Sequence, residues 1–256
     1  MRNLKLTLAY DGTEFHGWQV QPELATIQGE IERALGGIEG RRVSVNGSGR
    51  TDAGVHALRQ VASVALENPI PTLNLRRAMN RLLPPSIRVL EAEEAPADFH
   101  ARFSARAKLY EYRLWRAEIC PPMLYRYVCH HPYPLRLEPM VEAALLFEGA
   151  HDFRNFAATG PPEERSGEEK SPTVRTIFSS RFELDGDLLL YRVRGSGFLH
   201  HMVRNMVGTL LEVGKGNLAP ADIPRLLAGA DRSSPKQPRA GPTAAAQGLF
   251  LVQVEY

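Results

Sequence analysis

The chain has 256 residues, of which 43% are hydrophobic and 23% charged, and its formal net charge of +2 taken alone says little about partners. Its only two cysteines, Cys120 and Cys129, exclude a disulfide framework and fit a reducing compartment. The first residues lack the apolar core of a signal peptide, and no apolar run reaches the roughly 20 residues that span a bilayer, so we expect a soluble, cytoplasmic protein with no membrane partner.

The first part of the chain predicts the element order β-α-β-β-α-β. Apolar and polar side chains alternate over residues 4–10, which indicates a half-buried strand. Apolar residues at helical spacing predict a helix over 27–38 that is closed by Gly36-Gly37. The other elements expected here are strands at 42–46, 60–66 and 87–93 and a helix at 73–82.

The second part repeats this order. The patterns predict a strand over 108–116, a helix over 140–147, a hairpin turning at Asp185-Gly186, a helix over 198–213 ended by Gly214, and a strand over 249–255. The hairpin strands are expected at 173–184 and 188–194. Two stretches, 158–172 and 231–247, are rich in proline, glycine and charged residues and are expected to be long loops. Loops of this length are often functional, and either could bind a large substrate.

The duplicated order predicts an α+β fold made of two ferredoxin-like, RRM-like halves. We expect one extended antiparallel or mixed sheet with helices on one side and an RNA-binding cleft. The join falls near residues 97–106, so the predicted domains are 1–100 and 101–256.

The segment Gly47-Ser48-Gly49-Arg50-Thr51-Asp52-Ala53-Gly54-Val55-His56-Ala57 carries the strongest chemical signal. Glycines allow tight turns and close approach of a ligand. A carboxylate between them, two residues from Arg50, suits a base or nucleophile, because the guanidinium favours its ionised form. The lysine of a phosphate-binding loop is missing. The alternative is an Asx-type turn in which Asp52 bonds its own backbone amides.

Several features suit RNA. Of the 31 basic residues 26 are arginine, whose guanidinium forks onto phosphates and stacks on bases, although a composition bias of the source organism would explain the count equally well. Aromatic and basic residues interleave from Phe99 to Phe103 and again from Lys108 to Tyr112, as in sites for splayed bases. Phe99 and Phe103 would also fit a hydrophobic core. Tyr110 carries a hydroxyl on an otherwise apolar strand face, and that hydroxyl needs a partner.

The predicted helix over 198–213 places Arg204 among apolar neighbours. A buried arginine needs a carboxylate partner, and Asp52 is the candidate. Adjacent histidines on a helix, such as His200 and His201, point about 100° apart and make a poor metal pair. The spacing of Cys120, Cys129 and the histidines that follow matches no zinc pattern, so we expect no metal site.

At the loop motif, residues 49–57, the sequence closely resembles the tRNA pseudouridine synthase A family. The resemblance runs nearly end to end and its two most specific motifs are the loop around Asp52 and the segment that contains Arg204. It is carried by residues 10–13, 15–19, 49–57, 99–103, 110–112, 198–205 and 248–251.

The resemblance implies a cofactor-free homodimer that converts uridine to pseudouridine at positions 38–40 of the tRNA anticodon stem-loop. It implies that Asp52 is the catalytic aspartate, paired with Arg204, and that Tyr110 stacks on the flipped base. The further residues that it implies in substrate binding are Arg50 at the nucleotide backbone, Phe99, His100, Ala101, Arg102 and Phe103 along the RNA, and Leu249 at the base pocket.

This isomerisation exchanges no electrons and adds no water, so it needs neither a redox cofactor nor a metal. The carboxylate can act as nucleophile on the sugar or as base on a sugar proton, and the sequence leaves both open. One alternative function is a catalytically silent RNA-binding module, but a pure binder gains nothing from a carboxylate near phosphates. A small-molecule hydrolase would need a second acid to activate water, and residues 47–57 contain none.

Overall fold

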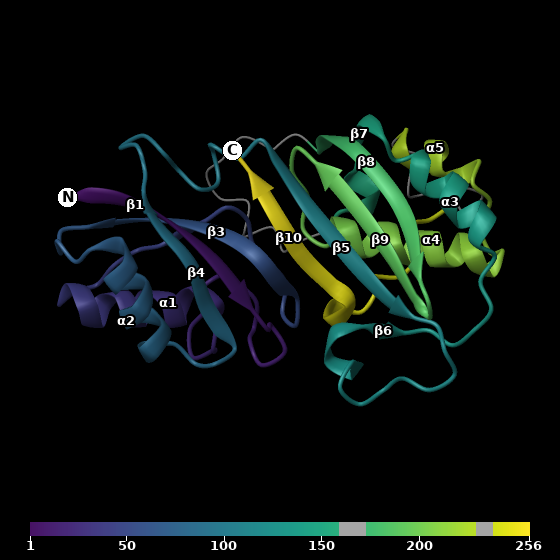
Figure 1. Ribbon diagram of the computed structural model, residues 1–256. Coiled ribbons are helices and arrows are strands. Elements are labelled where there is room, and N and C mark those ends of the chain that lie inside the picture. The colour runs from purple at the N-terminus through teal and green to yellow at the C-terminus, as the bar shows by residue number, and fades with distance from the viewer. Residues whose placement is uncertain (159–172, 229–237) are drawn as a thin grey trace. The chain divides into compact units, whose positions relative to one another are not determined.

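The computed structural model describes residues 1–158, 173–228 and 238–256 (Figure 1). They form two compact units, one made of Met1–Leu109 with Ala246–Tyr256 and the other of Tyr110–Ala245. These units have other bounds than the predicted domains 1–100 and 101–256, because the last strand belongs to the first unit. No helix in the described part of the chain is both long and apolar enough to cross a membrane.

The first unit follows the predicted order and ends with a strand from the far end of the chain. Its strands run in the order β4-β1-β3-β10, with β1 antiparallel to both β3 and β4, and β10 parallel to β3. Helix α1 packs against α2, and α2 packs against β4 (Figure 1). The elements are β1 Arg2–Tyr10, α1 Ile27–Glu39, β2 Asn46–Gly47, β3 His56–Leu66, α2 Thr72–Leu82, β4 Ile87–Glu94, η4 Ala246–Gly248 and β10 Leu249–Glu255.

The second unit has strands in the order β5-β9-β8-β7, and the short strand β6 pairs with β5 in parallel. The predicted β8–β9 hairpin is present, but its two turn residues are Gly186 and Asp187, one residue later than expected, because Asp185 still belongs to β8 and pairs with Leu188. Gly186 takes a positive φ of +57°. Its elements are β5 Ala107–Trp115, η1 Tyr125–Tyr127, β6 Cys129–His130, α3 Leu137–Leu145, β7 Gly149–Asp152, η2 Arg154–Phe156, β8 Val174–Asp185, β9 Leu188–Gly195, α4 Met202–Lys215 and α5 Asp222–Leu227.

The α+β fold class is confirmed: both units combine mostly antiparallel strands with helices. The apolar face predicted for β1 is confirmed, because Leu4, Leu6 and Leu8 are fully buried, but Thr7 on the opposite face is buried as well, so the strand is more than half-buried. Of the five apolar residues whose spacing predicted α1, Ile38 is partly exposed and the other four are buried: Ile27, Ile31, Ala34 and Leu35.

Two predictions for the first half were wrong. Helix α1 continues through Gly36-Gly37 and ends at Gly40, whose φ of +76° closes it in the left-handed conformation. Residues 42–45 form no strand, since the backbone N–H of Val45 donates to the Glu32 carboxylate (2.9 Å) and its carbonyl accepts from the Gln28 amide (3.0 Å). Side chains of α1 thus satisfy the groups that a neighbouring strand would have paired.

Two helices in the second half begin elsewhere than predicted. Helix α4 starts at Met202 rather than Phe198, because His201 has a φ of +60° that a helix cannot contain. His200 and His201 therefore precede the helix, and their rings lie 4.0 Å apart instead of pointing away from each other. Helix α3 starts at Leu137, three residues earlier than expected, since Pro139 is tolerated in its first turn. The stretches 159–172 and 229–237, which contain most of the first predicted long loop and part of the second, lie outside the described residues.

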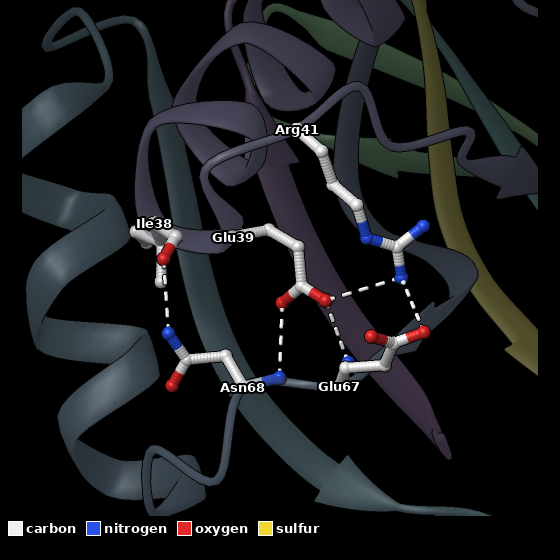
Figure 2. Close-up of polar contacts among 5 residues, drawn as sticks. All are labelled: Ile38, Glu39, Arg41, Glu67 and Asn68. Carbon is white, nitrogen blue, oxygen red and sulfur yellow. Dashed lines mark hydrogen bonds and ion pairs between the residues drawn. The ribbon is translucent and has the colours of Figure 1, made fainter.

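The end of α1 is fastened to the segment after β3 by the carboxylate of Glu39, whose side chain is 2% exposed (Figure 2). The carboxylate accepts hydrogen bonds from the backbone N–H groups of Glu67 (2.6 Å) and Asn68 (3.1 Å). Arg41 contacts Glu39 at 3.3 Å and Glu67 at 3.1 Å. The hydrogen bond from the Glu67 backbone, with those from Asn68 and Arg41, lowers the pKa of Glu39 although burial opposes this.

We expect Glu39→Gln to lower the free energy of unfolding by about 1 kcal/mol at neutral pH, because the hydrogen bonds lose their charged acceptor. The pKa of Glu39 is lower in the folded chain than in the unfolded chain, so its stabilisation is present above the ordinary glutamate range and is lost as the pH falls through the folded value. Urea unfolding at several pH values should show the parent and the variant converging in acid. A difference in the free energy of unfolding that stays the same at every pH would contradict this. So would an equally large loss of stability in the control variant Glu118→Gln, since Glu118 is exposed.

Candidate active site

Asp52 lies in the loop between β2 and β3 of the first unit and is partly exposed. The loop turns back at this residue, since the N–H of Val55 donates to the carbonyl oxygen of Asp52 (3.1 Å). His56, the next residue, already belongs to β3. This strand was predicted to begin at Gln60. Because β3 begins four residues earlier, Asp52 lies close to the first residue of a strand of the sheet.

The segment between β1 and α1 packs directly on this loop. The backbone N–H of Trp18 donates to the carbonyl of Thr51 (3.0 Å). Gly17 has a φ of +84°, and a Cβ at this position would lie 2.5 Å from the Thr51 oxygen. A Cβ at Gly12 would lie 2.0 Å from the carbonyl oxygen of Val55. Two motifs that stand far apart in the sequence, 10–19 and 49–57, therefore form one structural element, and glycine is required where their backbones meet.

A buried hydroxyl pair links β1 to the residue before Asp52. The Tyr10 hydroxyl and Thr51 Oγ1 are 2.9 Å apart, and both residues are buried. Burial raises the pKa of Tyr10 to about 12, although hydrogen bonds to Thr51 and Gln60 act in the other direction. The phenol therefore stays protonated at physiological pH and can donate to the threonine oxygen.

His56 connects the loop to β10. It is 1% exposed, its Nδ1 accepts from the backbone N–H of Gly12 (3.1 Å), and its ring stacks on Phe250 with centroids 4.7 Å apart. Phe250 is the β10 residue paired with His56 in the parallel register. Leu249, the predicted pocket residue, precedes it and is 5% exposed. The structure thus places Leu249 in the same unit as Asp52, on the strand that adjoins the end of the loop.

Arg50 is exposed on the same loop, where its Nε donates to Oε1 of Gln19 (3.1 Å). This contact again joins the two motifs of the first unit. The guanidinium remains at the surface, as a contact to a nucleotide backbone requires.

The predicted RNA segment 99–103 presents its side chains unequally. Phe103 is 75% exposed, with the Arg102 guanidinium 5.6 Å from its ring centroid and the His100 ring 4.4 Å away. Ala101 is fully buried, and Phe99 packs against Tyr256 with ring centroids 4.9 Å apart. Within this unit, Arg102 and Phe103 therefore offer most of the surface of the segment.

The other two predicted catalytic residues lie in the second unit. Tyr110, on β5, is 7% exposed and meets the ring of Phe198 edge-on at 5.0 Å. Arg204, in the first turn of α4, donates from Nε to the carbonyl of Ala244 (2.7 Å). The expected pairing of Arg204 with Asp52 stays a prediction.

Two contacts with the loop were missed by sequence reasoning, which did not single out Gln60 and placed Lys108 only in the expected RNA-binding strand. Gln60 donates a hydrogen bond to the carbonyl of Gly49, and Lys108 donates one to the carbonyl of Ser48. A glutamine among apolar strand residues was a usable signal for the first, because a buried amide must find partners. No local signal links Lys108 to Ser48, which is 60 residues away.

Comparison with known proteins gives a consistent result. A family model described as tRNA pseudouridine synthase matches residues 7–104 and 143–256. A protein of Solibacter usitatus named tRNA pseudouridine synthase A is 59% identical over 256 residues, covering 100% of both chains. Proteins with the same name from Geobacillus kaustophilus and Acetivibrio thermocellus are 44% and 41% identical over 256 residues, covering 100% of this chain and 95% and 100% of theirs.

Proposed function

The chain belongs to the tRNA pseudouridine synthase family, a family of isomerases, and we propose that it converts uridine to pseudouridine at positions 38–40 of the tRNA anticodon stem-loop. The observation that carries the proposal is 59% identity over the full length of a relative named tRNA pseudouridine synthase A. The family model covers Asp52, Arg204 and Leu249, while Tyr110 lies between its two matched stretches.

The reaction is an isomerisation at the nucleotide. The bond from N1 of the base to C1′ of the ribose breaks, the base turns over, and C5 bonds to C1′. The proton that C5 loses is balanced by the one that N1 gains, so no other reactant is consumed. The uridine must leave its stack to be reached, and basic and aromatic groups hold it out.

In this proposal Asp52 is the catalytic carboxylate. Its position in a loop fixed by close backbone contacts and a buried hydroxyl pair supports this role, because a reacting group must be held in one geometry. It attacks C1′ or removes a sugar proton, and both routes begin from the carboxylate form. Arg204 pairs with this carboxylate, as the family resemblance implies.

Tyr110 stacks on the flipped base and takes part in removing the C5 proton. Its nearly buried ring, braced edge-on by Phe198, supports a stacking role. Exposed Arg50 contacts the backbone of the flipped nucleotide, and Leu249 lines the base pocket. Residues 99–103 lie along the RNA, with the surface offered by Phe103 and Arg102 in support.

We further propose that the protein acts as a homodimer in the cytoplasm. The homodimer rests on the family resemblance, and the location is supported by the substrate class and by the two free cysteines, Cys120 and Cys129. The half that carries the aspartate loop, 1–100, and the half that carries the tyrosine strand and the arginine helix, 101–256, would act on the same RNA.

Pseudouridine mapping tests this function. Purified protein is incubated with unmodified tRNA transcripts and no added cofactor, and the products are mapped by chemistry specific for pseudouridine. We expect modification at uridines 38–40 and none in transcripts with cytidine at these positions. Pseudouridine at other positions only, or none in any tRNA that carries uridine there, would overturn the proposal.

A further inference from the structure

We propose that Gln60 and Lys108 are positioning residues that hold the start of the Asp52 loop and thereby aim the carboxylate at the ribose. The inference rests on the proposed function of Asp52 and adds two residues that act through it. Both lie in the first unit: Gln60 is on β3, and Lys108 is in the first three residues of β5, which precede the start of the second unit at Tyr110. Both bond the backbone of Ser48-Gly49.

The Gln60 amide is fully buried and uses its whole hydrogen-bonding capacity. Its Oε1 accepts from the Ser48 hydroxyl (2.6 Å) and from the N–H of Val61 (3.1 Å). Its Nε2 donates to the carbonyl of Gly49 (3.0 Å) and to the Tyr10 hydroxyl (3.4 Å). Since the N–H of Val61 can only donate, it fixes which end of the amide carries the oxygen. The amide therefore has one orientation in which every partner is satisfied.

Through Tyr10 the same network reaches the residue next to Asp52. The Tyr10 hydroxyl accepts from Gln60, which leaves its own proton for Thr51 Oγ1 at 2.9 Å. The chain of hydrogen bonds thus touches residues 48, 49 and 51 on one side of the loop. In a buried environment such a connected network is stiff, and removing one member leaves several polar groups without partners.

Lys108 fixes the same turn with a charged group. Its Nζ donates to the carbonyl oxygen of Ser48 at 2.6 Å, and a hydrogen bond from a charged donor is stronger than one between neutral groups. The N–H of Ser48 is bonded to the carbonyl of Val61 (2.8 Å), and its hydroxyl to Gln60. Every polar group of Ser48 is therefore used, and this residue becomes the fixed point from which the loop to Asp52 departs.

These contacts act on the geometry of the carboxylate more than on the fold. Strands β1, β3 and β4 are already paired over most of their length without the two side chains. The four residues from Gly49 to Asp52 transmit any displacement of Ser48 to the reacting group. A shift of about 1 Å in a catalytic group can lower the rate about 100-fold. The strand pairing of the sheet alone does not hold the loop this closely, so side-chain hydrogen bonds to the loop are also needed.

The test uses the full chain and measures kcat at saturating tRNA separately from the Kd for tRNA. We expect Gln60→Met and Lys108→Met each to lower kcat by about 10- to 100-fold with little change in Kd, because the loop loses its anchor but no RNA contact. Lys108→Arg should recover most of kcat, since its guanidinium can still donate to Ser48. Amide hydrogen exchange over residues 48–55 should become faster in both methionine variants.

Two control variants match these changes elsewhere in the unit. Asn80 is a side-chain amide that bonds Val89 N–H and carbonyl at 2.8 Å each, so Asn80→Leu removes comparable bonds far from the loop. Lys5 pairs with Glu93 at 3.3 Å, so Lys5→Met removes a comparable charge. Neither control should change kcat.

Other outcomes would overturn the inference. If Lys108→Met weakens tRNA binding with a shallower salt dependence while kcat stays at the parent value, the lysine contacts phosphate and does not position the loop. If Asn80→Leu loses as much kcat as Gln60→Met, the effect is a general loss of stability. A parent protein that forms no pseudouridine would instead refute the proposed function, which is a separate result.

Should Gln60→Met fail to fold, Gln60→Glu keeps the shape and removes only the donor. A buried glutamate regains a donor when it is protonated, so the ratio of variant to parent kcat should rise as the pH falls. A ratio that does not depend on pH, with folded variant protein throughout, contradicts the role of the Gln60 amide as a donor to Gly49.

Discussion

Asp52→Asn should lower pseudouridine formation by about 1000-fold or more while tRNA binding stays close to that of the parent protein. The amide has the size of the carboxylate but can neither attack C1′ nor accept the sugar proton. Because Asp52 is partly exposed, the substitution should change the free energy of unfolding little. Release of tritium from tRNA labelled at C5 of uridine gives the rate, and filter binding gives the affinity.

A matched control is Asp185→Asn at the tip of the β8–β9 hairpin. Asp185 is exposed and is the last residue of β8 before the turn, so the control removes one negative charge from the surface without disturbing the fold. It should release tritium at the parent rate. Equal rates for Asp52→Asn and the parent would remove Asp52 from the mechanism and leave an RNA-binding role for the loop.

Tyr110→Phe should lower kcat by about 100-fold and leave the Kd for tRNA nearly unchanged. The substitution keeps the ring and its edge-on contact with Phe198 but removes the hydroxyl that would assist removal of the C5 proton. If C5 deprotonation becomes rate-limiting, deuterium at C5 should slow the variant more than the parent. Single-turnover assays with C5-labelled and unlabelled tRNA measure this directly.

Tyr191→Phe is the corresponding control in the same unit. The Tyr191 hydroxyl is buried and lies 2.7 Å from Ser180 Oγ, so its loss should cost about 1 kcal/mol of stability. Turnover per folded molecule should not change. A Tyr110→Phe variant that binds tRNA poorly but turns it over normally would show that the hydroxyl contacts RNA and takes no part in proton transfer.

Elements with a clear side-chain period could be predicted from the sequence. The last strand, Leu249–Glu255, has the expected bounds. Strand β1 and helix α2 begin two residues and one residue earlier than expected and end where expected. Errors arose where a backbone conformation or a distant side chain decides the structure. The positive φ of His201 delays α4, and the Glu32 and Gln28 side chains replace a strand at Val45. Neither effect has a signature in local periodicity.

The candidate site shows the same division. The loop around Asp52 could be recognised because glycines, arginine and aspartate are adjacent in the sequence. Its support could not, since it comes from Gly12, Gly17, Gln60 and Lys108, which are close to it only after folding. The division of the chain into domains at residue 100 remains a prediction. In the structure, residues 246–256 pack in the first unit although they come last in the sequence, and no local pattern indicates this.

The return of β10 to the first unit has a consequence during protein synthesis. Its residues lie beside His56 and Ala57 at the end of the aspartate loop, yet the ribosome translates them long after these two residues. A nascent chain that already contains Asp52 thus lacks the strand at the end of its loop until residues 249–255 have been translated. Translation products that stop before residue 249 would carry the aspartate motif without this neighbour, so we expect activity only after β10 has left the exit tunnel and folded.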